Sequence, residues 1–122
     1  MDEVKEKSDY FSHLIGEQLS TVSFVMDYLQ LQFNGYLLTV LTPLVVVSDD
    51  HSYTFGDSGF RDALCERITQ KVKDTVLTSN YLRLVFEDNT NFNISLKKED
   101  YVGAEAINFH FPDVENTPLI VI

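Results

Sequence analysis

The dipeptide Asn34-Gly35 is the feature of this sequence that most constrains its fold. Asn-Gly readily adopts the two positive φ angles of a type I′ turn, which joins antiparallel strands through a two-residue loop. Apolar and polar residues alternate around the dipeptide across residues 28–40, YLQLQFNGYLLTV. This stretch therefore predicts a β-hairpin with one wholly apolar face, on which Phe33 pairs with Tyr36, Leu31 with Leu38 and Leu29 with Val40.

The opposite face of the predicted hairpin is half apolar. It carries Tyr28, Gln30, Gln32, Leu37, Thr39 and Leu41. A face that meets water is expected to be polar, so the leucines on this face predict a hairpin that is covered on both sides.

A second hairpin is predicted over residues 81–96. Tyr81, Leu82, Leu84 and Phe86 repeat Tyr28, Leu29, Leu31 and Phe33 at a constant offset of 53. With Asp88-Asn89-Thr90 as a three-residue loop, Asn89 takes the required positive φ. The apolar pairs are then Leu82 with Leu96, Leu84 with Ile94 and Phe86 with Phe92. The outer face is polar, with Arg83, Asn91, Asn93 and Ser95, and is expected to meet water.

The repeated signature predicts an internal duplication. A helix and a strand are expected before each hairpin, with the helices starting near Asp9 and near Gly59. Asp57 or Ser58 is expected to cap the second helix. Two half-domains, approximately residues 9–56 and 57–122, would then be related by a rough twofold axis. A chance likeness between strand-forming residues is the alternative.

The chain of 122 residues predicts one domain of the α+β class. We expect an antiparallel sheet, or a partly open β-barrel-like roll, of about eight strands with two helices. Pro43 cannot donate to a ladder, so residues 44–47 are predicted to form an edge strand or to start a new one. Residues 97–101 are predicted as one helical turn, and the polar residues 1–8 are expected to fray.

Nineteen acidic residues against nine lysines and arginines give a net charge of −10. This charge disfavours binding to nucleic acid or to an anionic membrane and favours a basic partner, although solubility alone is the alternative explanation. No run approaches the ~20 apolar residues of a membrane-spanning helix, and the charged N-terminus lacks the apolar stretch of a signal peptide. The single cysteine agrees with a reducing compartment, so we expect a cytoplasmic protein.

No motif in the sequence predicts catalysis, a metal or a cofactor. The three histidines have neither an i, i+4 partner nor a cysteine pair. Cys65 lies within the second predicted helix and is expected to be a small buried apolar residue rather than a nucleophile. Residues 56–59, GDSG, resemble a phosphate-binding helix start, but the charge of Asp57 would repel the anion. The chain is therefore not expected to be an enzyme.

Two clusters of carboxylates are the candidate partner-binding residues. The first acidic group is Asp49, Asp50 and Asp57; the second acidic group is Glu99, Asp100 and Glu105. Solvated turns are the alternative explanation for both. We favour the first group as the contact surface, because no lysine or arginine lies near it before Arg61, whereas Lys97 and Lys98 offset the second.

Residues 24–31 (FVMDYLQL), 59–65 (GFRDALC) and 99–106 (EDYVGAEA) resemble a group of small bacterial proteins. Members of that group are similar to immunity proteins of polymorphic toxin and contact-dependent growth inhibition systems. The resemblance extends from about residue 15 to residue 111, departs where Ala104 stands in place of an expected proline, and supplies no catalytic residues. It implies an immunity protein whose partner is a cognate toxin, with a basic nuclease domain favoured by the charge. The alternative is a small-ligand-binding or regulatory domain with an apolar cavity at the mouth of the sheet.

Overall fold

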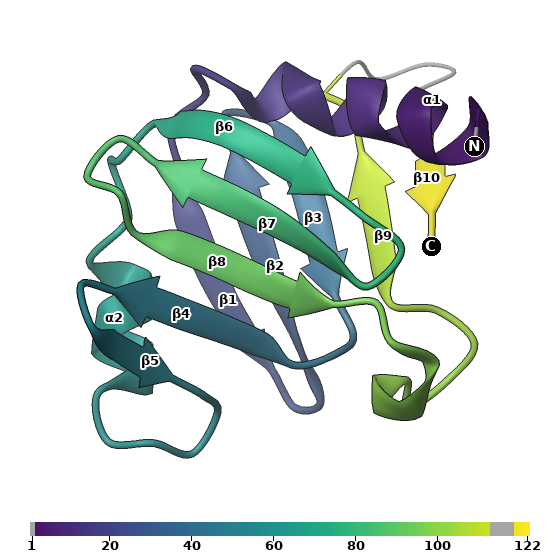
Figure 1. Ribbon diagram of the computed structural model, residues 1–122. Coiled ribbons are helices and arrows are strands. Elements are labelled where there is room, and N and C mark those ends of the chain that lie inside the picture. Colours follow the sequence, from purple (N-terminus) through teal and green to yellow (C-terminus); the bar gives the residue numbers. More distant parts are fainter. Residues whose placement is uncertain (1, 113–118) are drawn as a thin grey trace.

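The computed structural model describes residues 2–112 and 119–122, which form two stacked antiparallel sheets with two α-helices at their margins (Figure 1). Each sheet has five strands, and the sheets do not close into a barrel. The predicted antiparallel α+β class with two helices is confirmed, with ten strands in place of about eight.

The first sheet has the order β1-β2-β3-β9-β10. Its strands are β1 (Thr21–Val25), β2 (Tyr28–Phe33), β3 (Tyr36–Val40), β9 (Ile107–His110) and β10 (Leu119–Val121). The second sheet has the order β5-β4-β8-β7-β6. Its strands are β4 (Leu44–Ser48), β5 (His51–Tyr53), β6 (Val72–Leu77), β7 (Tyr81–Phe86) and β8 (Asn91–Ser95).

The Asn-Gly turn joins β2 and β3 in the predicted register. Asn34 has a φ of 51° and Gly35 a φ of 103°, so both turn residues are in the positive region that a type I′ turn requires. Phe33 pairs with Tyr36 and Leu31 with Leu38, as expected. The local chemistry of two residues therefore sets the register of the hairpin.

The register predicted for the second hairpin is wrong by two residues. Leu84 lies opposite Phe92 and Leu82 opposite Ile94, while the Phe86 amide donates to the Thr90 carbonyl. The loop is therefore 87–89, and Asn89, with a φ of 71°, is its last residue. Three-residue loops place a type I turn before the left-handed residue, which explains why the loop ends there. A shift of two keeps every side chain on its predicted face.

The strand orders of the two sheets are topologically equivalent. Exchanging each strand of the first half with the strand five positions later, β1 with β6 and so on to β5 with β10, converts one sheet order into the other. Each half also gives its last two strands to the other sheet, since β9 pairs with β3 and β4 pairs with β8. β4 begins directly after Pro43 and is an inner strand of the other sheet. This exchange accords with a duplication; the half-repeat boundaries stay a prediction.

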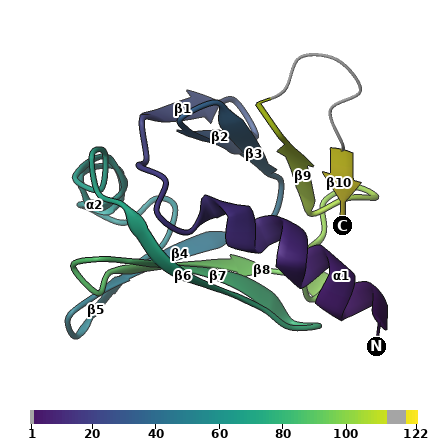
Figure 2. The same ribbon diagram turned by 90° about the horizontal axis from the view of Figure 1, so that it is seen from above.

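The helices lie beside the space between the sheets rather than over their outer faces (Figure 2). α1 (Asp2–Phe11) ends in a 3-10 turn, η1 (Ser12–Leu14), and places Phe11 in the core, where its ring stacks on Phe109 at 4.9 Å between centroids. This first helix starts earlier than predicted, and residues 2–8, expected to fray, are helical. α2 is the predicted second helix (Phe60–Cys65), and η2 (Lys98–Asp100) is the predicted helical turn.

No helix or strand of the described chain lies over the outer face of β2 and β3, so the chain itself does not supply the expected cover (Figure 2). Gln32 on this face is exposed, and Leu37 and Leu41 are half-buried. The inner faces form one core, with Leu31, Phe33, Phe86 and Phe92 fully buried. The polar outer face of the second hairpin is half-exposed, as predicted.

Candidate functional site

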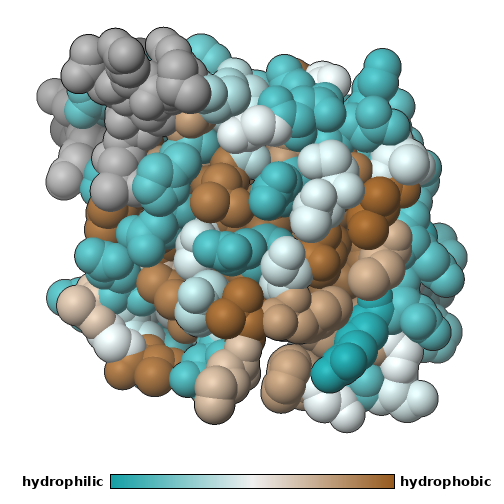
Figure 3. Space-filling view, turned by 180° about the vertical axis from the view of Figure 1, so that it is seen from behind, coloured by the Kyte–Doolittle hydropathy of each residue, from teal (hydrophilic) through white to brown (hydrophobic). Residues whose placement is uncertain are grey.

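A cleft opens at one end of the gap between the sheets. It has a volume of about 500 Å³ and is bounded by the β1–β2 turn, the β3–β4 connection, the loop from β5 to α2, and Val102. We call it the apolar cleft. Figure 3 shows apolar surface gathered around a hollow at the lower edge of the molecule. Cavities of this size, at the mouth between two sheets, are common positions for binding sites.

Exposed apolar side chains concentrate around this cleft. Five large apolar residues are exposed in the described chain, and four of them line the apolar cleft. The fifth is Ile15. Met26 is 93% exposed, Val102 89%, Phe55 75% and Phe24 36%. Single exposed apolar residues are ordinary, whereas a contiguous group marks a surface that binds another molecule.

Turn geometry explains why Met26 and Phe55 project into water. Met26 occupies the two-residue turn after Val25, which pairs with Tyr28. The carboxylate of Asp57 accepts hydrogen bonds from the backbone amide and the hydroxyl of Thr54, at 2.8 and 3.1 Å. These bonds close the loop around Phe55, so its ring stays outside the core. Asp57 therefore shapes the loop and does not cap α2, whose first turn has no side-chain cap.

Carboxylates outnumber cations across the apolar cleft and the hollow that adjoins it. Asp27 lines the cleft, and Asp57 and Asp62 line an adjoining hollow that shares Phe55 with it. All three are exposed. Arg61 is the one lysine or arginine among the described lining residues, and its guanidinium carbon lies 5.1 Å from the centroid of the Phe24 ring. Exposed carboxylates around an apolar centre favour a partner surface that combines apolar and basic side chains.

The equivalent position in the other half of the chain holds a second cleft of about 320 Å³. It lies at the β6–β7 turn, where the Thr78 amide donates to the Tyr81 carbonyl across two residues. Ser79 and Asn80 occupy this turn, at the offset of 53 from Met26 and Asp27. Lys97 and Lys98 also line this second cleft. The two clefts therefore have different rims, one apolar and acidic, the other polar and basic.

None of the six acids predicted to bind a partner lies inside the apolar cleft. Asp49 and Asp50 form the exposed β4–β5 turn, and Asp57 lies in the adjoining hollow. In the second acidic group, Asp100 accepts a hydrogen bond from the Ser95 hydroxyl, Glu105 is half-buried, and Glu99 is exposed. The first group lies on either side of β5 and the second between β8 and β9, so the two groups are not on equivalent connections of the two halves.

Asp27, Met26, Phe55 and Val102 are candidate site residues that the sequence reasoning missed. The alternation of Val22, Phe24 and Met26 places Met26 within the first predicted strand, whereas β1 ends at Val25 and Met26 lies in the turn. A usable signal was present for Phe55, which precedes a glycine-bounded loop. Large apolar residues in turns have no local core position to occupy. Their convergence on one cleft depends on the packing of the two sheets.

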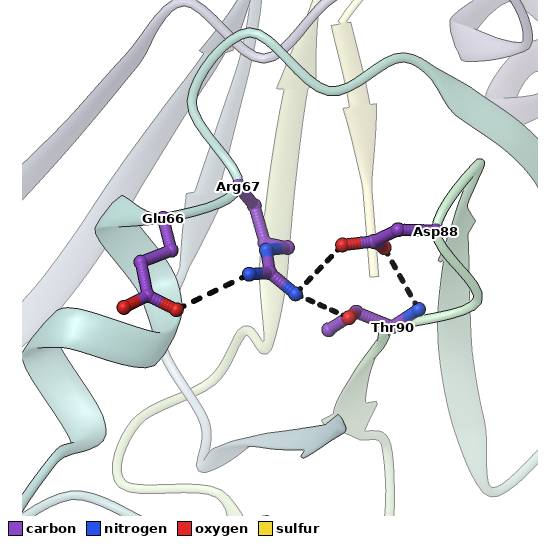
Figure 4. A network of polar contacts seen from close by, with 4 residues as sticks. All are labelled: Glu66, Arg67, Asp88 and Thr90. Atoms are coloured by element: carbon purple, nitrogen blue, oxygen red, sulfur yellow. Dashed lines mark hydrogen bonds and ion pairs between the residues drawn. The ribbon is translucent and has the colours of Figure 1, made fainter. Parts of the chain in front are cut away.

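The remaining polar groups serve the fold. Cys65 is exposed, so the expectation of burial is wrong; α2 ends at this residue, which lies beyond its buried side. Arg67 joins the end of α2 to the β7–β8 loop through Asp88, with 2.9 Å between Nη1 and Oδ2, and through the Thr90 hydroxyl (Figure 4). Residues 2–112 and 119–122 contain no group of three or more potential metal ligands.

Comparisons with models of protein families, with curated proteins and with solved structures found no match to this chain. Over the described ranges, no helix has the length and apolar character needed to cross a membrane.

Proposed function

We propose that this chain is an immunity-type binding protein that neutralises a cognate toxin in the cytoplasm by covering the basic surface of that toxin. A nuclease domain is the favoured class of toxin. The observation that carries the proposal is the group of exposed apolar side chains around one acidic-rimmed cleft. Such a surface is costly to leave in water and supplies binding energy when a partner covers it. The role requires no catalytic group of this chain.

The charge distribution supports a basic partner. Residues 8–60 contain six acids and no lysine or arginine, and this segment supplies β1 to β5, most of the apolar cleft and the first acidic group. A nuclease attracts phosphates with a basic surface, so an acidic inhibitor gains faster, steered association with it. The apolar side chains then slow dissociation, because they bury area on contact.

The test is to mix the purified chain with the toxin domain encoded beside its gene. We expect a one-to-one complex on size-exclusion chromatography, a nanomolar dissociation constant, and loss of nuclease activity at equimolar ratio. A control with the same toxin domain and an unrelated acidic protein separates specific inhibition from charge neutralisation. No complex at micromolar concentration, together with unchanged nuclease activity, would refute the proposed function.

A second candidate is the binding of a small apolar ligand in the same cleft. Its volume of about 500 Å³ favours this candidate, because small-molecule sites span roughly 300–1,000 Å³. The high exposure of Met26 and Val102 weighs against it, since a ligand site encloses its lining side chains. A thermal-shift screen of apolar metabolites distinguishes the two, and a raised melting temperature with a ligand that leaves toxin binding unchanged would favour the second candidate.

A further inference from the structure

The apolar cleft and the second cleft occupy equivalent positions but carry different chemistry. At equivalent turns, Met26 and Asp27 stand where Ser79 and Asn80 stand in the other half. Both turns are exposed two-residue connections, so neither pair of residues is required to fill a core. Folding alone therefore gives no reason for an apolar and acidic pair at one turn and a neutral polar pair at the other.

We propose that the apolar cleft receives a large apolar side chain of the partner, flanked in the partner's sequence by lysine or arginine that pairs with Asp27 and Asp57. This assignment rests on the proposed function and names the part of the partner that is bound. A cavity of about 500 Å³ accommodates one or two large side chains but not a whole helix, so the occupant is a projecting residue of a segment.

Contacts inside the cleft set the position of that side chain. Phe24 and Phe55 offer aromatic surface on opposite elements, the end of β1 and the loop before α2. Arg61 already lies over the Phe24 ring, which shields one side of the ring and leaves Phe55 and Met26 as the open contacts. Exposed apolar side chains of this kind act as anchors when a partner removes them from water.

The carboxylates at the rim select the charge of the flanking residues. Asp27 lies in the same turn as Met26, and Asp57 is held by its hydrogen bonds to Thr54 beside Phe55. A basic residue on either side of the inserted side chain thus meets an exposed carboxylate. At the second cleft, Lys97 and Lys98 would repel the same segment.

The chain contains no tryptophan, so a tryptophan peptide reports its own binding by fluorescence. The probe is the capped pentapeptide Lys-Lys-Trp-Lys-Lys, with Glu-Glu-Trp-Glu-Glu as the charge control. We expect a blue shift and saturable binding for the lysine peptide as its indole leaves water, and at least about tenfold weaker binding for the glutamate peptide. Equal binding of the two peptides, or no saturable shift with the lysine peptide at millimolar concentration, would overturn the assignment.

Matched variants locate the binding. Met26→Ser with Asp27→Asn gives the first turn the residues of the second, and Ser79→Met with Asn80→Asp makes the reverse exchange. The first double variant should weaken binding of the lysine peptide at least about tenfold, because it removes a methionine contact that peptide binding buries and a charge pair between Asp27 and a lysine. The reverse exchange should not weaken it. Unchanged melting temperatures establish that both variants fold, and loss of binding in the second variant alone would overturn the assignment.

A measurement with the toxin domain separates this inference from the proposed function. If the complex forms and the double variant with Met26→Ser and Asp27→Asn weakens it, the proposed function and the docking site are both supported. If the complex forms and the double variant leaves its dissociation constant unchanged, the proposed function stands and this docking site is wrong. Phe55→Ser gives an independent check from another loop, since Phe55 is 75% exposed and its ring meets the core through an edge contact with Phe60. An unchanged melting temperature establishes that this variant folds.

Discussion

Removing the carboxylate of Asp88 should destabilise the protein by about 2–3 kcal/mol, because the mostly buried Arg67 guanidinium would lose the nearer and less exposed of its two charged partners. The Arg67 side chain is 12% exposed, and its Nη1 lies 2.9 Å from Oδ2 of Asp88. A hydrogen bond to a charged group contributes about 1.5–3 kcal/mol, and Asp88 also accepts the Thr90 amide at 3.0 Å, which adds about 1 kcal/mol. Asp88 is one-third exposed, so water replaces part of this loss.

The assay is urea unfolding of Asp88→Ala followed by circular dichroism, with Glu66→Ala as the control. Glu66 contacts the same guanidinium at 3.3 Å but is 68% exposed, so its loss should cost less than about 0.5 kcal/mol. The melting temperature of Asp88→Ala should fall by about 10 °C for a domain of this size. Equal stabilities of the two variants would refute the reasoning that burial decides the strength of these ion pairs.

Two further outcomes follow from the turns. Replacing Asp49 and Asp50 together by lysine should slow association with the toxin domain and reduce the salt dependence of the association rate, measured by stopped flow. If binding is instead lost only when the charges of the second acidic group are reversed, the second group is the contact surface. Gly35→Ala should cost about 1–3 kcal/mol, since φ is +103° and a Cβ would lie 2.8 Å from Cβ of Pro112. Asn34→Gly should cost far less, because glycine adopts the positive φ freely, and similar losses for both in chemical unfolding would contradict the argument.

The predictions that succeeded rest on residues close together in the sequence. The register of the first hairpin follows from Asn34 and Gly35, whose backbone angles are set by their own chemistry. The start of α2 after Gly59 was also predicted from neighbouring residues, although the expected side-chain cap by Asp57 or Ser58 does not form. The second hairpin was placed on the correct faces but two residues out of register, because Asn89 allows more than one loop position and only the pairing of Phe86 with Thr90 selects between them.

The candidate site was predicted only in part. The sequence indicated an acidic first half and exposed turns, and the structure brings Asp57 beside the apolar cleft. Asp49 and Asp50 lie outside the cleft, and Met26 was not predicted as a site residue. Local patterns identify which residues lie in turns, but they carry no information on which turns meet.

By itself, the sequence determined the antiparallel strands, their buried faces and the equivalence of the two hairpins, because alternation and turn chemistry act over a few residues. Only the tertiary structure decided that β4 and β5 cross to the second sheet while β9 and β10 cross to the first. That exchange buries the inner faces of both hairpins against each other. It also brings Met26, Phe55 and Val102 to the rim of one cleft, because pairing between distant segments depends on the packing of the whole core.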